Sequence, residues 1–238
     1  MQLNILSAGA AQGVVMALAA QLKAETGAEL KGTFGAVGAM RDKLLAGEPC
    51  DLIILTQAQI TELAAKRHVL IDSAADLGTV RTGVAVRAGE PMPAIATPQE
   101  LRAALLAAEG IYFPDAIKST AGIHFAKVID SLGIRSEVES RLRTFPNGAT
   151  AMRAMVNENA FEEDTHLIGC TQVTEINNTP GAVLVGVLPK EFELATVYSV
   201  GVCANAASMA IARRFAAMLS NDASLALRTK HGYEFSSI

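Results

Sequence analysis

Short apolar segments alternate with segments of helical periodicity through the first part of the chain, and this alternation restricts the fold more than any other feature. The apolar segments are rich in Leu, Ile and Val, which is typical of strands buried on both faces. Strand and helix in such close alternation predict a parallel α/β sheet. The predicted strands are residues 3–6, 28–34 and 50–55, and the predicted helices are residues 14–28, 39–46 and 57–66.

A similar series recurs after a break near residues 80–90. Its predicted strands are residues 82–87, 110–113, 166–170, 183–185 and 195–204; its predicted helices are one opened by Thr97-Pro98 and residues 123–132, 151–158 and 206–219, with a loop at 114–122. The last apolar strand is well placed to return to the first half. We therefore expect lobe I to comprise residues 1–82 and 198–238, lobe II to comprise residues 83–197, and two hinge crossings to lie near 80–88 and 193–200.

A glycine-rich stretch at residues 32–41 joins a predicted strand to a helix in which Met40, Leu44 and Leu45 lie at helical spacing. Glycines let the backbone turn sharply and leave its N–H groups uncovered. A helix N-terminus with free N–H groups and a positive dipole end attracts anions. Similar loops of small residues lie at 7–11, 118–122 and 147–150. We expect these loops to line a cleft between the lobes that binds a small ligand.

Composition excludes several classes of function. The chain has 238 residues, of which 50% are hydrophobic and 18% charged, so a globular protein with a substantial core is expected. Its net charge of −4 gives no basic face, so no nucleic acid partner is predicted. The three cysteines are Cys50, Cys170 and Cys203; they show no metal-ligand spacing, and two lie inside apolar runs typical of buried thiols. No metal and no cofactor are predicted.

No apolar run approaches the roughly 20 residues that span a bilayer, so direct membrane insertion is not expected. The first predicted strand begins almost at the N-terminus, which leaves no room for a secretory leader. The sequence as written is therefore expected to be cytoplasmic. A periplasmic location, and an ABC permease as partner, would follow only if a leader had been removed.

Several motifs in order resemble the molybdate-binding branch of the type 2 periplasmic solute-binding proteins. They are Ser7-Ala-Gly-Ala10, Leu22-Lys-Ala-Glu-Thr-Gly27, Gly32-Thr-Phe-Gly-Ala-Val-Gly38, Leu45-Ala-Gly-Glu-Pro-Cys-Asp-Leu-Ile-Ile54, Ser119-Thr-Ala-Gly-Ile123, Ala212-Arg-Arg-Phe-Ala216 and His231-Gly-Tyr233. The resemblance covers essentially the whole chain. It implies two lobes, each a mostly parallel sheet flanked by helices, with an oxyanion or carboxylate bound between them.

The chain departs from that family pattern in its ligand loops. Molybdate-binding members use hydroxyl side chains from the first two loops, where this chain has Gly9-Ala10-Ala11 and Ala36-Val37-Gly38. Each missing charge-assisted hydrogen bond costs about 1.5–3 kcal/mol, so we expect a small organic carboxylate rather than molybdate. The candidate ligand-binding residues are Ser7, Gly9, Ala10, Ala36, Val37, Ser119, Thr120, Asn147, Thr150, Thr171 and Gln172.

An enzyme is the alternative, because aconitate isomerases are similar to this family. Such an isomerase moves a proton between carbon atoms and needs a general base near the substrate. The loops offer His124, Lys118 and Glu175 as candidates. A ligand-sensing domain of a regulator shares the architecture, but no helix-turn-helix or basic region accompanies it here. The sequence leaves open the identity of the ligand, binding against turnover, the oligomeric state and whether Met1 is the native start.

Overall fold

The computed structural model describes residues 1–158 and 166–235. Contacts within the chain divide it into two compact units. Unit 1 comprises residues 1–80 and 196–238, and unit 2 comprises residues 81–195. The chain therefore leaves unit 1 near residue 80 and returns to it near residue 196.

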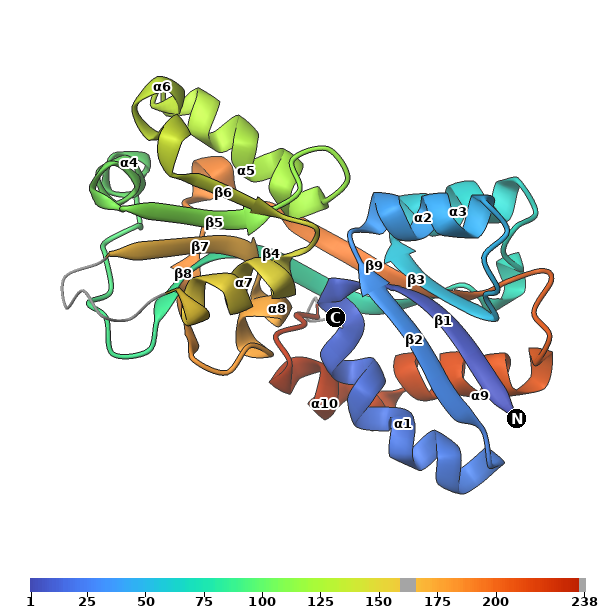
Figure 1. Ribbon diagram of the computed structural model, residues 1–238. Coiled ribbons are helices and arrows are strands. Elements are labelled where there is room, and N and C mark those ends of the chain that lie inside the picture. Colours follow the sequence, from blue (N-terminus) through green and yellow to red (C-terminus); the bar gives the residue numbers. More distant parts are fainter. Residues whose placement is uncertain (159–165, 236–238) are drawn as a thin grey trace. The chain divides into compact units, whose positions relative to one another are not determined.

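Unit 1 is a sheet with helices on both faces (Figure 1). Its strand order is β2-β1-β3-β9, with β2, β1 and β3 parallel and β9 antiparallel to β3. In Figure 1, α2 and α3 lie on one face and α1 and α9 on the other. The strands are β1 (Gln2–Ala8), β2 (Glu29–Gly35), β3 (Leu52–Thr56) and β9 (Ala195–Val202); the helices are a 3₁₀ turn η1 (Gly9–Ala11), α1 (Gln12–Thr26), α2 (Val37–Leu45), α3 (Gln57–Ala65), α9 (Met209–Ser220) and α10 (Leu225–Lys230).

Unit 2 is built in the same way. Its sheet order is β8-β4-β7-β5-β6, with β7, β5 and β6 parallel and β4 antiparallel to both β7 and β8. The strands are β4 (Ala75–Arg87), which begins in unit 1, β5 (Gly110–Pro114), β6 (Leu142–Phe145), β7 (Leu167–Gln172) and β8 (Ala182–Val187); the helices are α4 (Pro98–Ala107), α5 (Thr120–Ser131), α6 (Arg135–Val138), α7 (Gly148–Asn157) and α8 (Val173–Asn177).

The central strands of unit 2 supply two separate cores, one on each face of the sheet. Successive residues of a strand point to opposite faces. Phe113 accordingly packs in one core with α4, α5 and α6, whereas its neighbour Tyr112 packs in the other core with α7 and α8. Ile168 and Leu167 divide in the same way. Burial on both faces explains why these strands are almost continuously apolar, and it confirms the prediction of buried parallel strands.

Two local predictions were wrong. β4 begins at Ala75 and not at residue 82, because Gly78, with φ of 126°, carries the strand through a conformation that only glycine adopts easily. The predicted loop 114–122 ends early, because α5 begins at Thr120 after its N-cap Ser119.

Candidate functional site

In each unit the parallel strands end at one edge of the sheet, and each is followed by a helix. Ligands of open α/β sheets bind beyond the carboxyl ends of the strands. In unit 1 these ends lead into η1, α2 and α3; in unit 2 they lead into α5, α7 and α8. The predicted ligand-binding residues of unit 1 therefore lie together at one edge, and those of unit 2 lie together at another. We describe the two groups separately.

The helix starts after β1 and β2 have no side-chain caps. Ala8 is the N-cap of η1 and Ala36 is the N-cap of α2, and neither makes a side-chain cap hydrogen bond. Neither helical segment has an acidic residue in its first turn. By contrast, Thr56 caps α3 by accepting a hydrogen bond from the N–H of Gln59. Unit 1 thus presents two helix starts that have neither a side-chain N-cap nor an acidic residue in the first turn.

Ser7 is the one hydroxyl residue among the predicted ligand residues of unit 1, and its proton is already used. The Ser7 Oγ donates to the carbonyl of Ala8 at 2.9 Å, and the residue is fully buried. Gly9, Ala10, Ala36 and Val37 offer only backbone groups. The donors that the first two loops of unit 1 present are therefore backbone N–H groups.

In unit 2 the starts of α5 and α7 are capped by side chains, whereas Gln172, the N-cap of α8, makes no side-chain cap hydrogen bond. The Ser119 Oγ accepts from the N–H of Gly122 at 3.5 Å, and the Asn147 Oδ1 accepts from the N–H of Thr150 at 2.9 Å. The Thr150 hydroxyl donates to the same Asn147 oxygen at 3.0 Å and accepts from Arg153. Asn147 and Thr150 are thus engaged with each other at the start of α7. Thr120 is the first residue of α5 and is half-buried.

Glu175 also caps the N-terminus of α7. Its carboxylate accepts hydrogen bonds from the backbone N–H groups of Gly148, Ala149 and Gln172, and from the Thr171 hydroxyl at 2.5 Å. An internal carboxylate therefore occupies the position at which an external anion would meet the N-terminus of α7. Glu175 is one of the residues predicted as a candidate base, and the structure places it, together with Thr171, in the cap of this helix.

Close packing around Gly148 holds this cap in place. A Cβ atom at Gly148 would lie 1.9 Å from the Thr171 Oγ1 and 2.0 Å from the Glu175 Oε2. Only glycine lets the first turn of α7 approach the carboxylate so closely. Burial raises the pKa of Glu175 above its ordinary value, and the hydrogen bonds that it accepts offset part of this rise.

Gln172 is the least satisfied polar side chain near these helix starts. It is 2% exposed at the end of β7, and among the described residues neither its Nε2 nor its Oε1 has a hydrogen-bond partner. Thr82 lies opposite it on β4, and Thr174 follows it in α8; their Oγ1 atoms are also buried without a partner. A buried polar atom without a partner costs about 1–3 kcal/mol, so this cluster of three side chains is unusual within unit 2.

Sequence reasoning named Gln172 but missed Thr82 and Thr174. Thr82 was assigned to a strand and treated as scaffold. A polar residue at the start of the apolar run Gly83-Val-Ala-Val86 was the signal that could have identified it. Nothing local marks Thr174, whose burial depends on how α8 packs.

The other two candidate bases, His124 and Lys118, make hydrogen bonds to residues outside this cluster. The Nε2 of His124 is 2.7 Å from the carbonyl oxygen of Phe192, which leaves only Nδ1 for other chemistry if Nε2 carries the proton. Lys118 is exposed, and its backbone N–H donates to the Asp115 carboxylate in the turn before α5.

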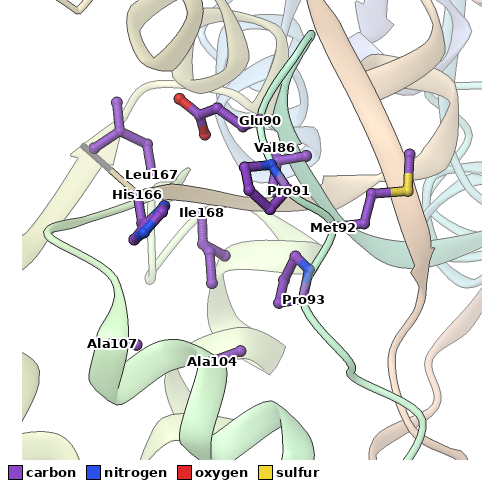
Figure 2. A pocket seen from close by; sticks show the side chains of 10 residues that line it. All are labelled: Val86, Glu90, Pro91, Met92, Pro93, Ala104, Ala107, His166, Leu167 and Ile168. Atoms are coloured by element: carbon purple, nitrogen blue, oxygen red, sulfur yellow. The ribbon is translucent and has the colours of Figure 1, made fainter. Parts of the chain in front are cut away.

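A separate pocket of about 200 Å³ lies in unit 2 (Figure 2). Val86, Pro93 and Ile168 are among the apolar side chains that line it, and His166 and Glu90 also face it. It adjoins the first residues of β7, whereas Gln172 is the last residue of that strand. The pocket therefore lies away from the helix starts, and its lining offers few donors for an anion.

Within residues 1–158 and 166–235, no three His, Cys, Asp or Glu side chains are placed to hold a metal ion. None of the helices described in that part of the chain is long and apolar enough to cross a membrane.

Residues 3–234 match the family model described as bacterial extracellular solute-binding protein. The chain belongs to this family. An aconitate isomerase from a Pseudomonas species is 25% identical over 205 residues, which cover 83% of this chain and 74% of that protein. The family match agrees with the predicted resemblance to the type 2 periplasmic solute-binding proteins.

Solved structures of other solute-binding proteins share this fold. The molybdate-binding protein of Azotobacter vinelandii has a TM-score of 0.77 at 16% identity, covering 99% of this chain and all of that one. The sulfate-binding protein of Mycobacterium tuberculosis has a TM-score of 0.70 at 15% identity, covering 100% of this chain and 88% of that one. These neighbours confirm the predicted α/β type 2 periplasmic-binding-protein fold and the likeness to its molybdate-binding branch.

The raised pKa of Glu175 predicts a pH dependence of stability. The folded state binds the Glu175 proton more tightly than the unfolded state does, so this group stabilises the fold most below its ordinary pKa of 4.5 and less as the pH rises through the folded value. The Glu175→Gln side chain does not titrate. We expect the free energy of unfolding of the wild type, minus that of Glu175→Gln, to fall as the pH rises above about 4.5, measured by urea unfolding.

Glu109→Gln is the matched control for this measurement, because Glu109 is exposed in the same unit. It makes the same change of side chain at an exposed position and reports what that change does apart from burial. A wild-type advantage over Glu175→Gln that grows with pH would contradict the prediction, because it would mean that the hydrogen bonds outweigh burial.

Proposed function

We propose that this protein binds a small organic carboxylate; the candidate donors are backbone N–H groups at the starts of η1 and α2 in unit 1 and, as a separate group, the amide of Gln172 in unit 2. The observation that carries the proposal is the buried, unpaired amide of Gln172. A folded protein tolerates such a group where a ligand or a water molecule completes its hydrogen bonds. The solute-binding family supports a small ligand as that partner.

An anion suits unit 1 because its two uncapped helix starts combine free N–H groups with positive dipole ends. Unit 2 contains an example of a carboxylate bound at a helix start. The carboxylate of Glu175 lies at the start of α7 and accepts hydrogen bonds from four donors. The starts of η1 and α2 have no side-chain N-cap and no acidic residue in their first turns. An external carboxylate is the chemical counterpart that would complete them.

A carboxylate is favoured over molybdate by what the first two loops contain. They hold no free hydroxyl donor, because the Ser7 hydroxyl donates to Ala8 and the neighbouring loop positions are glycine, alanine and valine. The amide of Gln172 also presents an acceptor, Oε1, which neither molybdate nor an ionised carboxylate group can satisfy, so a hydroxyl group of the ligand or a water molecule would have to donate to it. That one anion is held by donors of both units stays a prediction, as does delivery to an ABC permease by an exported form of the protein.

Isomerisation of a small tricarboxylate is the second candidate function, and the similarity to an aconitate isomerase favours it. The reaction removes a proton from one carbon and returns a proton to another, so it needs a base within reach of the substrate. Glu175 and Lys118 are the proposed candidates, with His124 restricted to its Nδ1. The carboxyl of Glu175 is buried and already accepts hydrogen bonds in the cap of α7, so proton transfer by it would require that cap to open.

A thermal-shift panel on the purified protein tests the proposal. It compares citrate, cis- and trans-aconitate, tricarballylate and smaller diacids with molybdate, tungstate, sulfate and phosphate. A ligand at a hundred times its dissociation constant adds about 2.7 kcal/mol, or roughly 5–10 °C for a chain of this size. We expect a shift of this size with at least one carboxylate and none with the inorganic anions.

A shift with molybdate alone would overturn the carboxylate assignment, and no shift with any anion would overturn anion binding. Proton NMR of cis-aconitate with catalytic amounts of the protein then separates binding from turnover. Appearance of the trans isomer would establish the isomerase, and an unchanged spectrum beside a clear thermal shift would establish a binding protein.

Substitution of Gln172 tests the observation on which the proposal depends. Gln172→Met keeps the volume and removes both unpaired polar atoms, so we expect the ligand-free protein to gain about 1–2 kcal/mol of stability and the thermal shift with the best carboxylate to be largely lost. The exposed Gln99 of α4 provides the control, Gln99→Met, which should keep the full shift. Equal ligand shifts in both variants would exclude Gln172 from binding.

Substitution of Ala36 tests the uncapped start of α2. Ala36→Asp places a carboxylate at the N-cap, where it accepts the N–H groups that the ligand would use. We expect about 1 kcal/mol of added stability without ligand and at least about tenfold weaker carboxylate binding by calorimetry. Ala20→Asp, on the exposed side of α1, adds the same charge and should bind normally. Undiminished binding by Ala36→Asp would remove α2 from the site.

A further inference from the structure

Two cysteines of unit 1 lie in contact although 152 residues separate them in the chain. The Sγ atoms of Cys50 and Cys203 are 3.4 Å apart. Cys50 precedes β3, and Cys203 follows β9, the strand that pairs with β3. Cys50 is partly exposed and Cys203 is buried, whereas the third cysteine, Cys170, is buried in unit 2.

We propose that Cys50 and Cys203 form a reversible disulfide that joins the two chain segments of unit 1. A disulfide requires an S–S distance of about 2.05 Å, so the sulfur atoms must approach by about 1.4 Å, which rotation of two side chains in contact can supply. The crosslink would close a loop that contains all of unit 2. It would hold β9, α9 and α10 to the first 80 residues of the chain.

The backbone on both sides of the sulfur pair is held in place. The N–H of Cys203 donates to the carbonyl of Asp51 at 3.0 Å, and the N–H of Asp51 donates to the carbonyl of Asn4 at 2.8 Å. The Asp51 carboxylate in turn accepts from the N–H groups of Asn4 and Ser208 at 2.8 and 3.0 Å. The contact between Cys50 and Cys203 therefore rests on a network that ties β1, β3 and the start of α9 together.

The environments of the two thiols assign their roles in the reaction. Cys50 is the accessible sulfur, so its thiolate attacks one sulfur of a low-molecular-weight disulfide such as oxidised glutathione and releases one glutathione thiolate. The Cys203 sulfur then attacks the Cys50 sulfur and releases the second glutathione. The protons of both cysteines end on the two glutathione thiols, so the two cysteines are oxidised and one glutathione disulfide is reduced.

The pKa of Cys203 is consistent with this order. Its hydrogen bond with Cys50, its burial and the nearby Asp51 carboxylate all raise the pKa of the Cys203 thiol. Cys203 therefore acts second, after Cys50 has become a mixed disulfide and no longer shares a proton with it.

Intact-mass analysis of the full chain tests the proposal. The protein is incubated with oxidised glutathione, then unfolded in an excess of a thiol-alkylating reagent. We expect the wild type to lose the mass of two hydrogen atoms and to take up one alkyl group, on Cys170. Three alkyl groups after oxidation, or a crosslink that joins two chains or includes Cys170, would overturn the proposal.

Three serine variants make the result specific. Cys170→Ser should still form the crosslink and take up no alkyl group. Cys203→Ser should stop at a glutathione adduct on Cys50, and Cys50→Ser should gain no crosslink. Closing so long a loop should also raise the Tm of the oxidised wild type by about 5 °C or more over the reduced protein. This redox-dependent difference should be absent in Cys50→Ser; its presence there would contradict the assignment.

Discussion

The N–H groups in the first turn of each helix need hydrogen-bond partners, and the functional architecture of this chain depends on which helices have them. Parallel strands deliver several helix starts to one edge of each sheet. In unit 2 the protein's own side chains close them, with Asn147 and Glu175 at α7 and Ser119 at α5. In unit 1 the alanines at the starts of η1 and α2 supply no such group. The two units are similarly built but differ in how their helix starts are capped.

Glu175 shows what an anion does on this scaffold. Its carboxylate accepts hydrogen bonds from the first turn of α7, from the end of β7 and from the Thr171 hydroxyl, and Gly148 is small enough to let the backbone reach it. The cost is the burial of an ionisable group, visible as a raised pKa. The likeness in fold to molybdate- and sulfate-binding proteins says nothing about which anion is bound, because that depends on side chains at the loops. In this chain the loops at the starts of η1 and α2 consist of glycine, alanine and valine.

Much of the fold was predictable because its signals are local. The capping box that opens α4 pairs Thr97 with Glu100, three residues later, and its pattern is legible in the sequence. The apolar run at β3 likewise identified a strand buried on both faces. The prediction failed where a glycine is needed for close packing against another segment and not for a turn. Gly122 was assigned to a loop, but it lies inside α5, where a Cβ would approach the Asp115 carbonyl to 2.2 Å.

The sequence by itself determined the alternation of strand and helix, the class of fold and the family, because periodicity and motif order are properties of neighbouring residues. Only the tertiary structure decided which polar groups are satisfied. Gln172 lies opposite Thr82, a residue 90 positions away in the chain. Both side chains are buried, and their polar atoms have no hydrogen-bond partner among the described residues. Cys50 and Cys203 meet because β9 returns to pair with β3. Hydrogen-bond satisfaction and sulfur contacts depend on distances between segments remote in sequence, which no local pattern encodes.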